Sequence, residues 1–295
     1  MSRARESSSP GAEGERGAKA LRVRWYAWPV ADGQARHPPD GPREMDVGGV
    51  EVGSGVHAPG GVWTFGGDTP RGFDGHVASS IPAYGECHEL VLDIADQLVP
   101  PGGRCYDLGC STGALTARLA ERLGPRGAEV IGVDREPGMI EAAAERCTGL
   151  SSVRFDVSAL ENAEIEPADL AVSFYTLQFV PLRQRQAVLA RIQRALAPAG
   201  ALILFEKILA STANAQDVSV GVYSDFKRRH GFTDDEIAAK ARSLRGVLQP
   251  LPAEQNYAML GRAGFTELIQ VFRWMIFDGV IAYASADAAE RGSSP

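Results

Sequence analysis

The chain has 295 residues, of which 44% are hydrophobic, and a formal net charge of −7 at pH 7. This length allows a single α/β domain with additions and a sizeable buried core. The negative charge argues against a broad phosphate-binding surface, so we expect no direct contact with nucleic acid, although a local basic patch stays open. No apolar run has the length of a membrane span, and the N-terminal residues lack a signal-peptide pattern, so we expect no membrane association.

The four cysteines, at positions 87, 105, 110 and 147, have neither metal-binding nor paired spacing. Cys105 and Cys110 flank the end of a predicted strand, where reduced cysteines serve as small packing residues. His88 stands between acidic and thiol neighbours, but adjacent residues on a helix point in different directions, so we predict no metal site. The cysteines instead favour a reducing, cytoplasmic setting.

Residues 1–61 are interpreted as an N-terminal arm. Residues 1–18 are rich in Ser, Gly, Glu and Arg, which predicts disorder. Residues 21–27 alternate between apolar and polar side chains and fit one strand, and residues 47–52 fit a second, short one. No pattern in this arm indicates a function.

From residue 62, where we expect the ordered domain to begin, helical and extended patterns alternate. An apolar stripe through Leu90, Val91, Ile94 and Leu98 predicts a helix over residues 86–98. Further helices are predicted at 114–123, 137–147 and 182–196, and strands at 168–173 and 201–205. This alternation predicts a parallel sheet with right-handed crossovers.

After residue 207 three helices are predicted in a row, at 219–229, 233–245 and 253–263, followed by strands at 265–274 and 275–285. Thr233 and Glu236 form a capping-box pattern at the start of the middle helix. We expect residues 213–263 to be a helical insertion that covers the carboxyl edge of the sheet as a lid and substrate wall. The catalytic domain is then 62–286, and 287–295 is predicted to be a disordered tail.

The most informative stretch is the turn Tyr106-Asp107-Leu108-Gly109-Cys110-Ser111-Thr112-Gly113. Two glycines with three residues between them allow a tight turn and leave room for a ligand beside a strand end. The spacing is G-x-x-x-G after an acid, which suits a cationic, phosphate-free ligand better than a dinucleotide. Asp134 ends a second apolar run about 25 residues later, where a carboxylate holds ribose hydroxyls. Asp156 ends a third.

Three acids at strand ends resemble the class I S-adenosylmethionine-binding fold. The resemblance implies a Rossmann-like, seven-stranded, mostly parallel sheet with helices on both faces, and S-adenosyl-L-methionine as the cofactor. It places the amino-acid portion at the glycine turn, the ribose at Asp134 and the adenine amino group at Asp156. An ordinary doubly wound sheet with acidic helix caps is the alternative. The residues expected to contact the cofactor are Tyr84, Asp107, Gly109, Cys110, Ser111, Gly113, Asp134, Arg135, Asp156, Val157 and Phe174.

A narrower resemblance extends from Trp63 to Ala286. It is carried by Trp63-Thr64-Phe65, Ile81-Pro82-Ala83-Tyr84, the glycine turn, Thr176-Leu177-Gln178-Phe179, Glu206-Lys207, Asp225-Phe226-Lys227-Arg228 and Gly231-Phe232-Thr233. These segments resemble the carboxy-S-adenosylmethionine synthase family. That family takes carbon dioxide from prephenate and attaches it to the methyl group of S-adenosylmethionine. A partner enzyme uses the product to modify a wobble uridine in transfer RNA.

Two positions depart from that family. The resemblance implies an arginine for the new carboxylate where this chain has Ala241, and an asparagine where it has Phe174. Arg242 follows directly, but one residue is about 100° of helix rotation, so Arg242 need not point the same way. An alanine cannot replace a bidentate arginine. We therefore expect methyl transfer to a small-molecule acceptor, with carboxy-S-adenosylmethionine synthesis and an inactive, cofactor-binding partner subunit as alternatives.

A methyltransferase needs in-line positioning and, for some acceptors, a general base. The catalytic candidates are Tyr84, Tyr175, Glu206, Tyr223, Asp225 and Arg242, the last as a displaced carboxylate anchor. Other roles stay open: Tyr84 as a cover for the cofactor, Tyr175 as a core residue, and Asp225 as a partner of Arg228 or Arg229. The sequence does not indicate the acceptor, and a homodimer is compatible with it.

Overall fold

The computed structural model describes residues 22–25, 50–53, 57–58, 63–67 and 69–285. The stretches 1–18 and 287–295, for which we predict disorder, lie outside these residues. The main sheet contains β1 (Arg22–Trp25), β4 (Arg104–Leu108), β5 (Glu129–Asp134), β6 (Val153–Val157), β7 (Ala168–Phe174), β8 (Leu196–Lys207), β9 (Phe265–Trp274) and β10 (Phe277–Ala284). A separate pair consists of β2 (Val50–Glu51) and β3 (His57–Ala58).

The strand order is β1-β6-β5-β4-β7-β8-β10-β9. Every neighbouring pair is parallel except the two that β10 makes, with β8 and with β9, which are antiparallel. Seven of these strands make up the expected mostly parallel sheet, and the α/β class is confirmed. The eighth, β1, falls within residues 21–27 and runs parallel to β6, with Arg22 opposite Arg154. The segment preceding the domain therefore covers what would otherwise be an open sheet edge.

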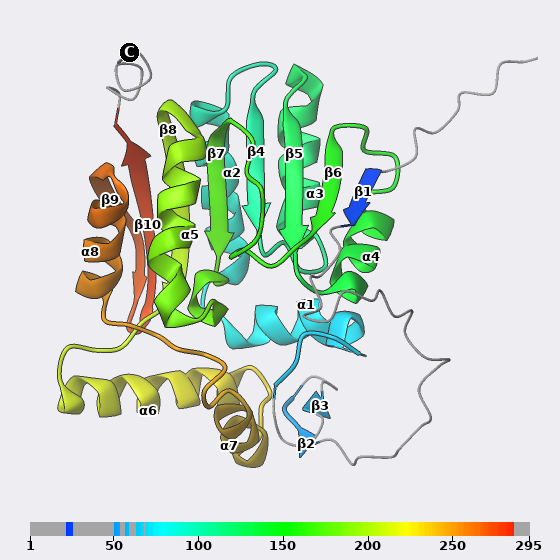
Figure 1. Ribbon diagram of the computed structural model, residues 1–295. Coiled ribbons are helices and arrows are strands. Elements are labelled where there is room, and N and C mark those ends of the chain that lie inside the picture. Colours follow the sequence, from blue (N-terminus) through cyan, green and yellow to red (C-terminus); the bar gives the residue numbers. More distant parts are fainter. Residues whose placement is uncertain (1–21, 26–49, 54–56, 59–62, 68, 286–295) are drawn as a thin grey trace, which may run out of the picture.

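Helices cover both faces of the sheet (Figure 1). They are α1 (Thr69–Ser80), α2 (Tyr84–Leu98), α3 (Ala114–Leu123), α4 (Pro137–Arg146), α5 (Leu182–Ala195), α6 (Ala213–Arg229), α7 (Asp234–Ser243) and α8 (Ala253–Ala263). One core joins the sheet to α2, α3 and α4 through residues such as Val91, Leu119 and Ile140. A second core joins it to α5 and α8 through Leu189 and Leu260. No helix among the described residues combines the length and apolar character that a bilayer crossing needs.

Helix α1 is absent from the sequence-based prediction. Its segment contains Gly72 and Gly75, which lower helix propensity. Its buried residues include Phe73 and His76, and the ring of His76 stacks on Trp63 at 5.6 Å between centroids. Tertiary packing thus stabilises a helix that local propensity does not indicate.

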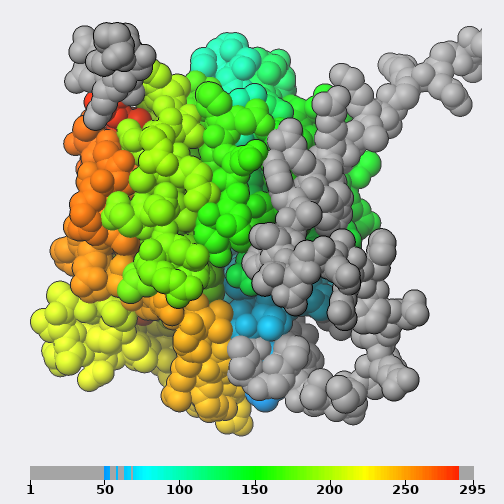
Figure 2. Space-filling view, in the orientation of Figure 1, coloured from blue at the N-terminus to red at the C-terminus, as the bar shows by residue number. Residues whose placement is uncertain are grey.

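The lid is shorter than the predicted insertion 213–263. Helices α6 and α7 lie across the carboxyl ends of the parallel strands, and Figure 2 shows α6 in yellow along that edge. Helix α8 instead packs against α5 and β9, and its Met259 and Leu260 lie in the second core. Helix α8 buries its apolar stripe by packing against the sheet, so this helix belongs to the body of the domain and not to the lid. The capping box of Thr233 and Glu236 at the start of α7 is confirmed.

Candidate active site

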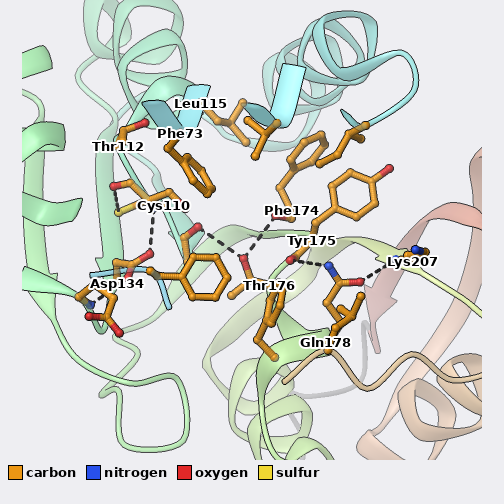
Figure 3. A pocket seen from close by; sticks show the side chains of 18 of the residues that line it. Phe73, Cys110, Thr112, Leu115, Asp134, Phe174, Tyr175, Thr176, Gln178 and Lys207 are labelled. Carbon is orange, nitrogen blue, oxygen red and sulfur yellow. Dashed lines mark hydrogen bonds between the residues drawn. The ribbon is translucent and has the colours of Figure 1, made fainter. Parts of the chain in front are cut away.

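A cavity of about 210 Å³ lies at the carboxyl ends of β4, β5, β7 and β8, under α1, α6 and α7 (Figure 3). The strand ends contribute Asp107, Asp134, Phe174 and Lys207 to its wall. Parallel strands bring their carboxyl ends to one edge, which is why residues a hundred positions apart in sequence meet here. Among the described residues, no group of three or more His, Cys, Asp or Glu side chains could hold a metal ion.

The glycine turn has the conformation that its sequence requires. Gly109, Ser111 and Gly113 all have positive φ, at 84°, 49° and 74°. A side chain at Gly109 would collide with Thr176, which follows β7. Gly109 and Ser111 line the cavity, whereas Gly113 does not: it precedes α3 and packs against Ala143. Gly113 thus shapes the turn from outside the cavity.

Replacing Gly109 with Ala tests this turn. Left-handed backbone costs a non-glycine residue about 1–2 kcal/mol, and the collision with Thr176 adds to it. We expect the free energy of unfolding to fall by more than about 2 kcal/mol, measured by urea denaturation. Gly149→Ala is the matched control, because Gly149 has φ 90° and open space around it. Equal losses for both variants would contradict the close approach to Thr176.

Asp134 is held in place by backbone amides. Its Oδ2 accepts a hydrogen bond from Ser111 N at 2.9 Å, and its Oδ1 accepts one from Glu136 N at 3.0 Å. An ionised carboxylate has about four acceptor positions, so two remain for a ligand. The neighbouring Arg135 also lines the cavity, with its side chain largely exposed.

Asp107 lies at the base of the cavity. It is 2% exposed, and its carboxylate accepts a hydrogen bond from the Thr116 hydroxyl at 2.6 Å. Burial raises the pKa of Asp107 to about 6. A cationic ligand nearby would stabilise the ionised form, so this position suits the positive charge inferred from the sequence. The buried Cys110 lines the wall beside it, and all four described cysteines are free.

Three rings form one side of the cavity: Tyr84, His88 and Phe174. The ring centroids of Tyr84 and His88 are 4.4 Å apart, and those of His88 and Phe174 are 4.8 Å apart. Burial lowers the pKa of His88 to about 4, so this imidazole is neutral at pH 7. Burial raises the pKa of Tyr84, whose phenol therefore stays protonated. Sequence reasoning did not place His88 in the site.

Tyr175 lines the cavity in a strained conformation. Its φ of 57° is unusual for a residue with a side chain, and its buried hydroxyl has no hydrogen-bond partner among the described residues. Its ring packs against Phe205 and Phe277. Tyr175 thus belongs to both the core and the cavity wall.

Glu206 does not reach the cavity. It is 2% exposed and accepts a hydrogen bond from Gln178 N at 3.2 Å, and burial raises its pKa to about 8. The fully buried Arg185 donates to the carbonyls of Gln178 and Val180 at 2.8 and 2.9 Å. The Gln178 side chain donates to Tyr175 O and accepts from Lys207 N, each at 2.9 Å (Figure 3). Glu206 therefore helps to position Gln178, which lines the cavity, without reaching the cavity itself.

Asp225 and Arg242 also lie outside the cavity lining. Helix α6 turns Tyr223 and Lys227 inward, and Asp225, half-way between them, is exposed and paired with Arg228 at 2.6 Å. Two residues correspond to about 200° of helix rotation, which places Asp225 on the outer face. On α7 the inward residue is Lys240, while Ala241 and Arg242 are exposed.

Asp156 and Val157 are likewise not part of the lining. Asp156 is on the same face of β6 as Arg154, which donates to it at 3.0 Å, because residues two apart on a strand share a face. Val157 packs against the first core. Ser158, Leu160 and Glu161 reach the cavity instead, from the loop after β6.

Sequence reasoning missed several residues that form the wall. They are Trp63, Phe65, Phe73, His76, Thr112, Gln178, Lys207 and Lys240. The segments Trp63-Thr64-Phe65 and Glu206-Lys207 were visible as part of a resemblance, but no local pattern indicated that their side chains face a ligand.

Comparisons with known proteins agree with this geometry. Residues 106–200 match the model of the methyltransferase domain family. A solved O-methyltransferase family protein from Burkholderia thailandensis has the same fold, with a TM-score of 0.52 and 15% identity over 74% of this chain and 60% of that one. Fold, domain and glycine-turn cavity define an enzyme of the S-adenosylmethionine-dependent methyltransferase class.

More similar relatives specify the family. A carboxy-S-adenosyl-L-methionine synthase from Trichlorobacter lovleyi is 37% identical over 71% of this chain and 88% of its own length. One from Nitratiruptor sp. is 34% identical over the same shares, 71% and 88%. The chain belongs to the carboxy-S-adenosyl-L-methionine synthase family.

Proposed function

We propose that this chain transfers the methyl group of S-adenosylmethionine to a small molecule bound under α6 and α7, and that it does so in the cytoplasm as part of small-molecule metabolism. The observation that supports this most directly is the continuity of the cavity. It extends from Asp134, at the end of β5, to Lys207 and Tyr223 under the lid. The expected cofactor end and the lid end therefore open into one another, as in-line transfer between a donor and an acceptor requires.

The residues at the β4 and β5 end fit the cofactor. Asp134 would hold the ribose hydroxyls with its two remaining acceptor positions, and Asp107 would face the positive amino-acid portion. When bound, S-adenosylmethionine supplies a methyl group already activated by a positive sulfonium. The protein then has to orient the acceptor and exclude water, and its apolar wall serves both purposes.

Of the catalytic candidates from the sequence, Tyr84 and Tyr223 line the cavity and are placed to contact the acceptor. Burial raises the pKa of both phenols, so they are donors of hydrogen bonds rather than bases at neutral pH. The open cavity opposes the alternative of an inactive partner subunit, because such a subunit has no need of an acceptor site.

Carboxy-S-adenosylmethionine synthesis is the second candidate, favoured by the 37% identity to a relative with that name over 88% of its length. Against it, the position expected to hold the carboxylate anchor is the exposed Ala241, and Phe174 lies in the ring cluster instead of an asparagine. We therefore place methyl transfer first.

Mass spectrometry of the ligand that copurifies with the protein tests this choice. Ordinary S-adenosylmethionine or its demethylated product supports methyl transfer. A cofactor heavier by one carboxyl group, or its formation from prephenate and S-adenosylmethionine by the purified protein, would establish the synthase instead.

Replacing Asp134 with Ala tests the cofactor site. Loss of charged hydrogen bonds should weaken binding of S-adenosylhomocysteine by about 2 kcal/mol or more, roughly 30-fold, in calorimetry. Asp156→Asn is the control, because Asp156 lies outside the cavity lining and should leave the affinity unchanged. An unchanged affinity of the Asp134 variant would refute the assignment.

A further inference from the structure

Helix α1 packs in a hydrophobic cluster that is separate from the two cores of the sheet. This third cluster contains Val52, Ala58, Trp63, Phe73, Met139 and Ala239. Backbone contact adds to it, because Trp63 N donates a hydrogen bond to Ser243 O, at the end of α7, at 3.0 Å. Residues 63–67, α1 and α7 therefore form one packing unit, which we call the cap.

The cap lies against the expected cofactor end of the cavity. Side chains of α1 and of the segment before it line the cavity: Trp63, Phe65, Phe73, His76, Val77 and Ser80. A side-chain carbon at Gly66 would lie 3.2 Å from Oε2 of Glu136, two residues after Asp134. A side-chain carbon at Gly138, on α4, would lie 3.8 Å from Pro70 in the first turn of α1. A cofactor bound at Asp134 would thus lie beside the cap, and movement of the cap would change its access to solvent.

Asp74 joins α1 to the two elements that surround the cofactor end. Its Oδ1 accepts a hydrogen bond from the Thr112 hydroxyl, in the glycine turn, at 2.5 Å. Its Oδ2 accepts one from Arg146, the last residue of α4. At the other end of α1, Ser80 O accepts a hydrogen bond from the Tyr223 hydroxyl of α6 at 2.8 Å. Helix α1 is therefore fastened to the cofactor end by Asp74 and to the lid by Tyr223.

Asp74 itself lies outside the cavity lining. The inward residues of α1 are spaced by three and four positions, which is the spacing of one helix face. Asp74 follows Phe73 directly, so it points about 100° away from that face. The side chains of Asp74 and Arg146 are 43% and 40% exposed. Asp74 can therefore act on a bound cofactor only through the position of α1.

We infer that Asp74 is a positioning residue that holds the cap closed over the cofactor and sets the rate of cofactor exchange. This inference rests on the proposed function, because it places the cofactor at Asp134. Since Asp74 lies outside the lining, its loss should favour opening of the cap equally in the free and the bound protein. Entry and exit of the cofactor should then accelerate together, and the affinity should change little. Damage to the binding site itself would instead accelerate exit alone.

Stopped-flow binding and isotope-chase dissociation of labelled S-adenosylhomocysteine, on the full chain, test this inference. For Asp74→Ala we expect both rate constants to rise about tenfold, as for loss of a hydrogen bond to a charged group, with Kd changed less than about threefold. Asp74→Asn keeps an acceptor for the Thr112 hydroxyl, and Arg146→Met removes only an exposed ion pair. Each of these two variants should raise both rate constants by a smaller factor, about two- to threefold.

Asp96→Ala is the matched control. Asp96, on α2, also accepts from two partners, with Arg122 Nε at 2.5 Å and Arg126 Nη2 at 3.4 Å, and it lies outside the lining. Its loss should leave both rate constants unchanged. Hydrogen exchange adds a readout that needs no cofactor: the amides of α1 should exchange faster in Asp74→Ala than in wild type, and at the wild-type rate in Asp96→Ala.

The inference fails if Asp74→Ala leaves both rate constants unchanged, or if dissociation alone accelerates and the affinity falls in proportion. It also fails if Asp96→Ala accelerates exchange of the cofactor as much as Asp74→Ala does. If S-adenosylhomocysteine does not bind the wild-type protein, while loss of Asp74 still speeds hydrogen exchange in α1, the proposed function is overturned and Asp74 stands as the residue that fastens the cap.

Discussion

Replacing Arg185 with Met should destabilise the protein by about 3–5 kcal/mol, the usual consequence of removing one partner from a buried charged network. Arg185 is fully buried, and its guanidinium holds the carbonyls of Gln178 and Val180. It also supplies the positive charge that favours ionisation of Glu206. Urea denaturation measures the loss, and Arg183→Met, an exposed cation on the same helix, is the control.

The pH dependence of the stability difference between the Arg185 variant and wild type shows whether lost charge or lost packing causes it. The pKa of Glu206 is raised from 4.5 to about 8 in the folded protein. The folded state therefore binds more protons than the unfolded state between these values, and Glu206 lowers stability as pH rises through this window. Without Arg185 that loss should extend to higher pH, so the gap between variant and wild type should widen above pH 8. Adding Glu206→Gln should remove the widening. A gap independent of pH would mean that packing alone is responsible.

Replacing Lys240 with Met should stabilise the ligand-free protein. The pKa of Lys240 falls from 10.5 to about 5 on folding, so the unfolded state binds more protons between these values. Lys240 thus opposes folding below pH 10, and its contribution becomes less unfavourable as pH rises through the window. We expect a gain of about 1 kcal/mol or more at pH 7, roughly 2–4 °C in Tm.

The gain should be largest near pH 6 and shrink toward pH 10. Differential scanning calorimetry across this range, without ligand, measures it, and Arg245→Met provides the baseline for loss of a lid charge. A Lys240→Met protein that melts below wild type at pH 6 would show that the ammonium is balanced by a partner in the folded state.

Much of the fold could be predicted because its signals are local. Helix α3 begins and ends where the residues after the glycine turn predict it, and α8 matches residues 253–263. The place of α8 on the sheet could not be predicted, since an apolar stripe shows that a helix is buried but not against what. Helix α1 was missed because Gly72 and Gly75 weaken its propensity and its burial depends on Trp63, outside the helix.

The residues of the candidate site likewise divide into those that local sequence signals predict and those that only tertiary packing decides. Asp134 and Gly109 could be found because strand-end acids and glycine turns leave fixed spacings. The direction of a side chain on the lid has no such signal: Asp225 and Lys227 are two residues apart on α6, and only the packing of α6 decides that Lys227 turns inward. Asp156 satisfied the spacing but faces Arg154, because strand alternation and not distance along the chain decides which face it occupies.

Ser111 in the glycine turn and Tyr175 after β7 line the cavity with left-handed backbone, and Ala83, directly before the lining residue Tyr84, has the same conformation. Each such conformation costs about 1–3 kcal/mol and persists only where the surrounding structure enforces it. The floor of the cavity is thus shaped before any ligand arrives, at the expense of stability elsewhere. A ligand need not order this floor, so little of its binding free energy is lost there. Selection between related substrates should then depend on the side chains that α6 and α7 contribute to the cavity, Tyr223 and Lys240.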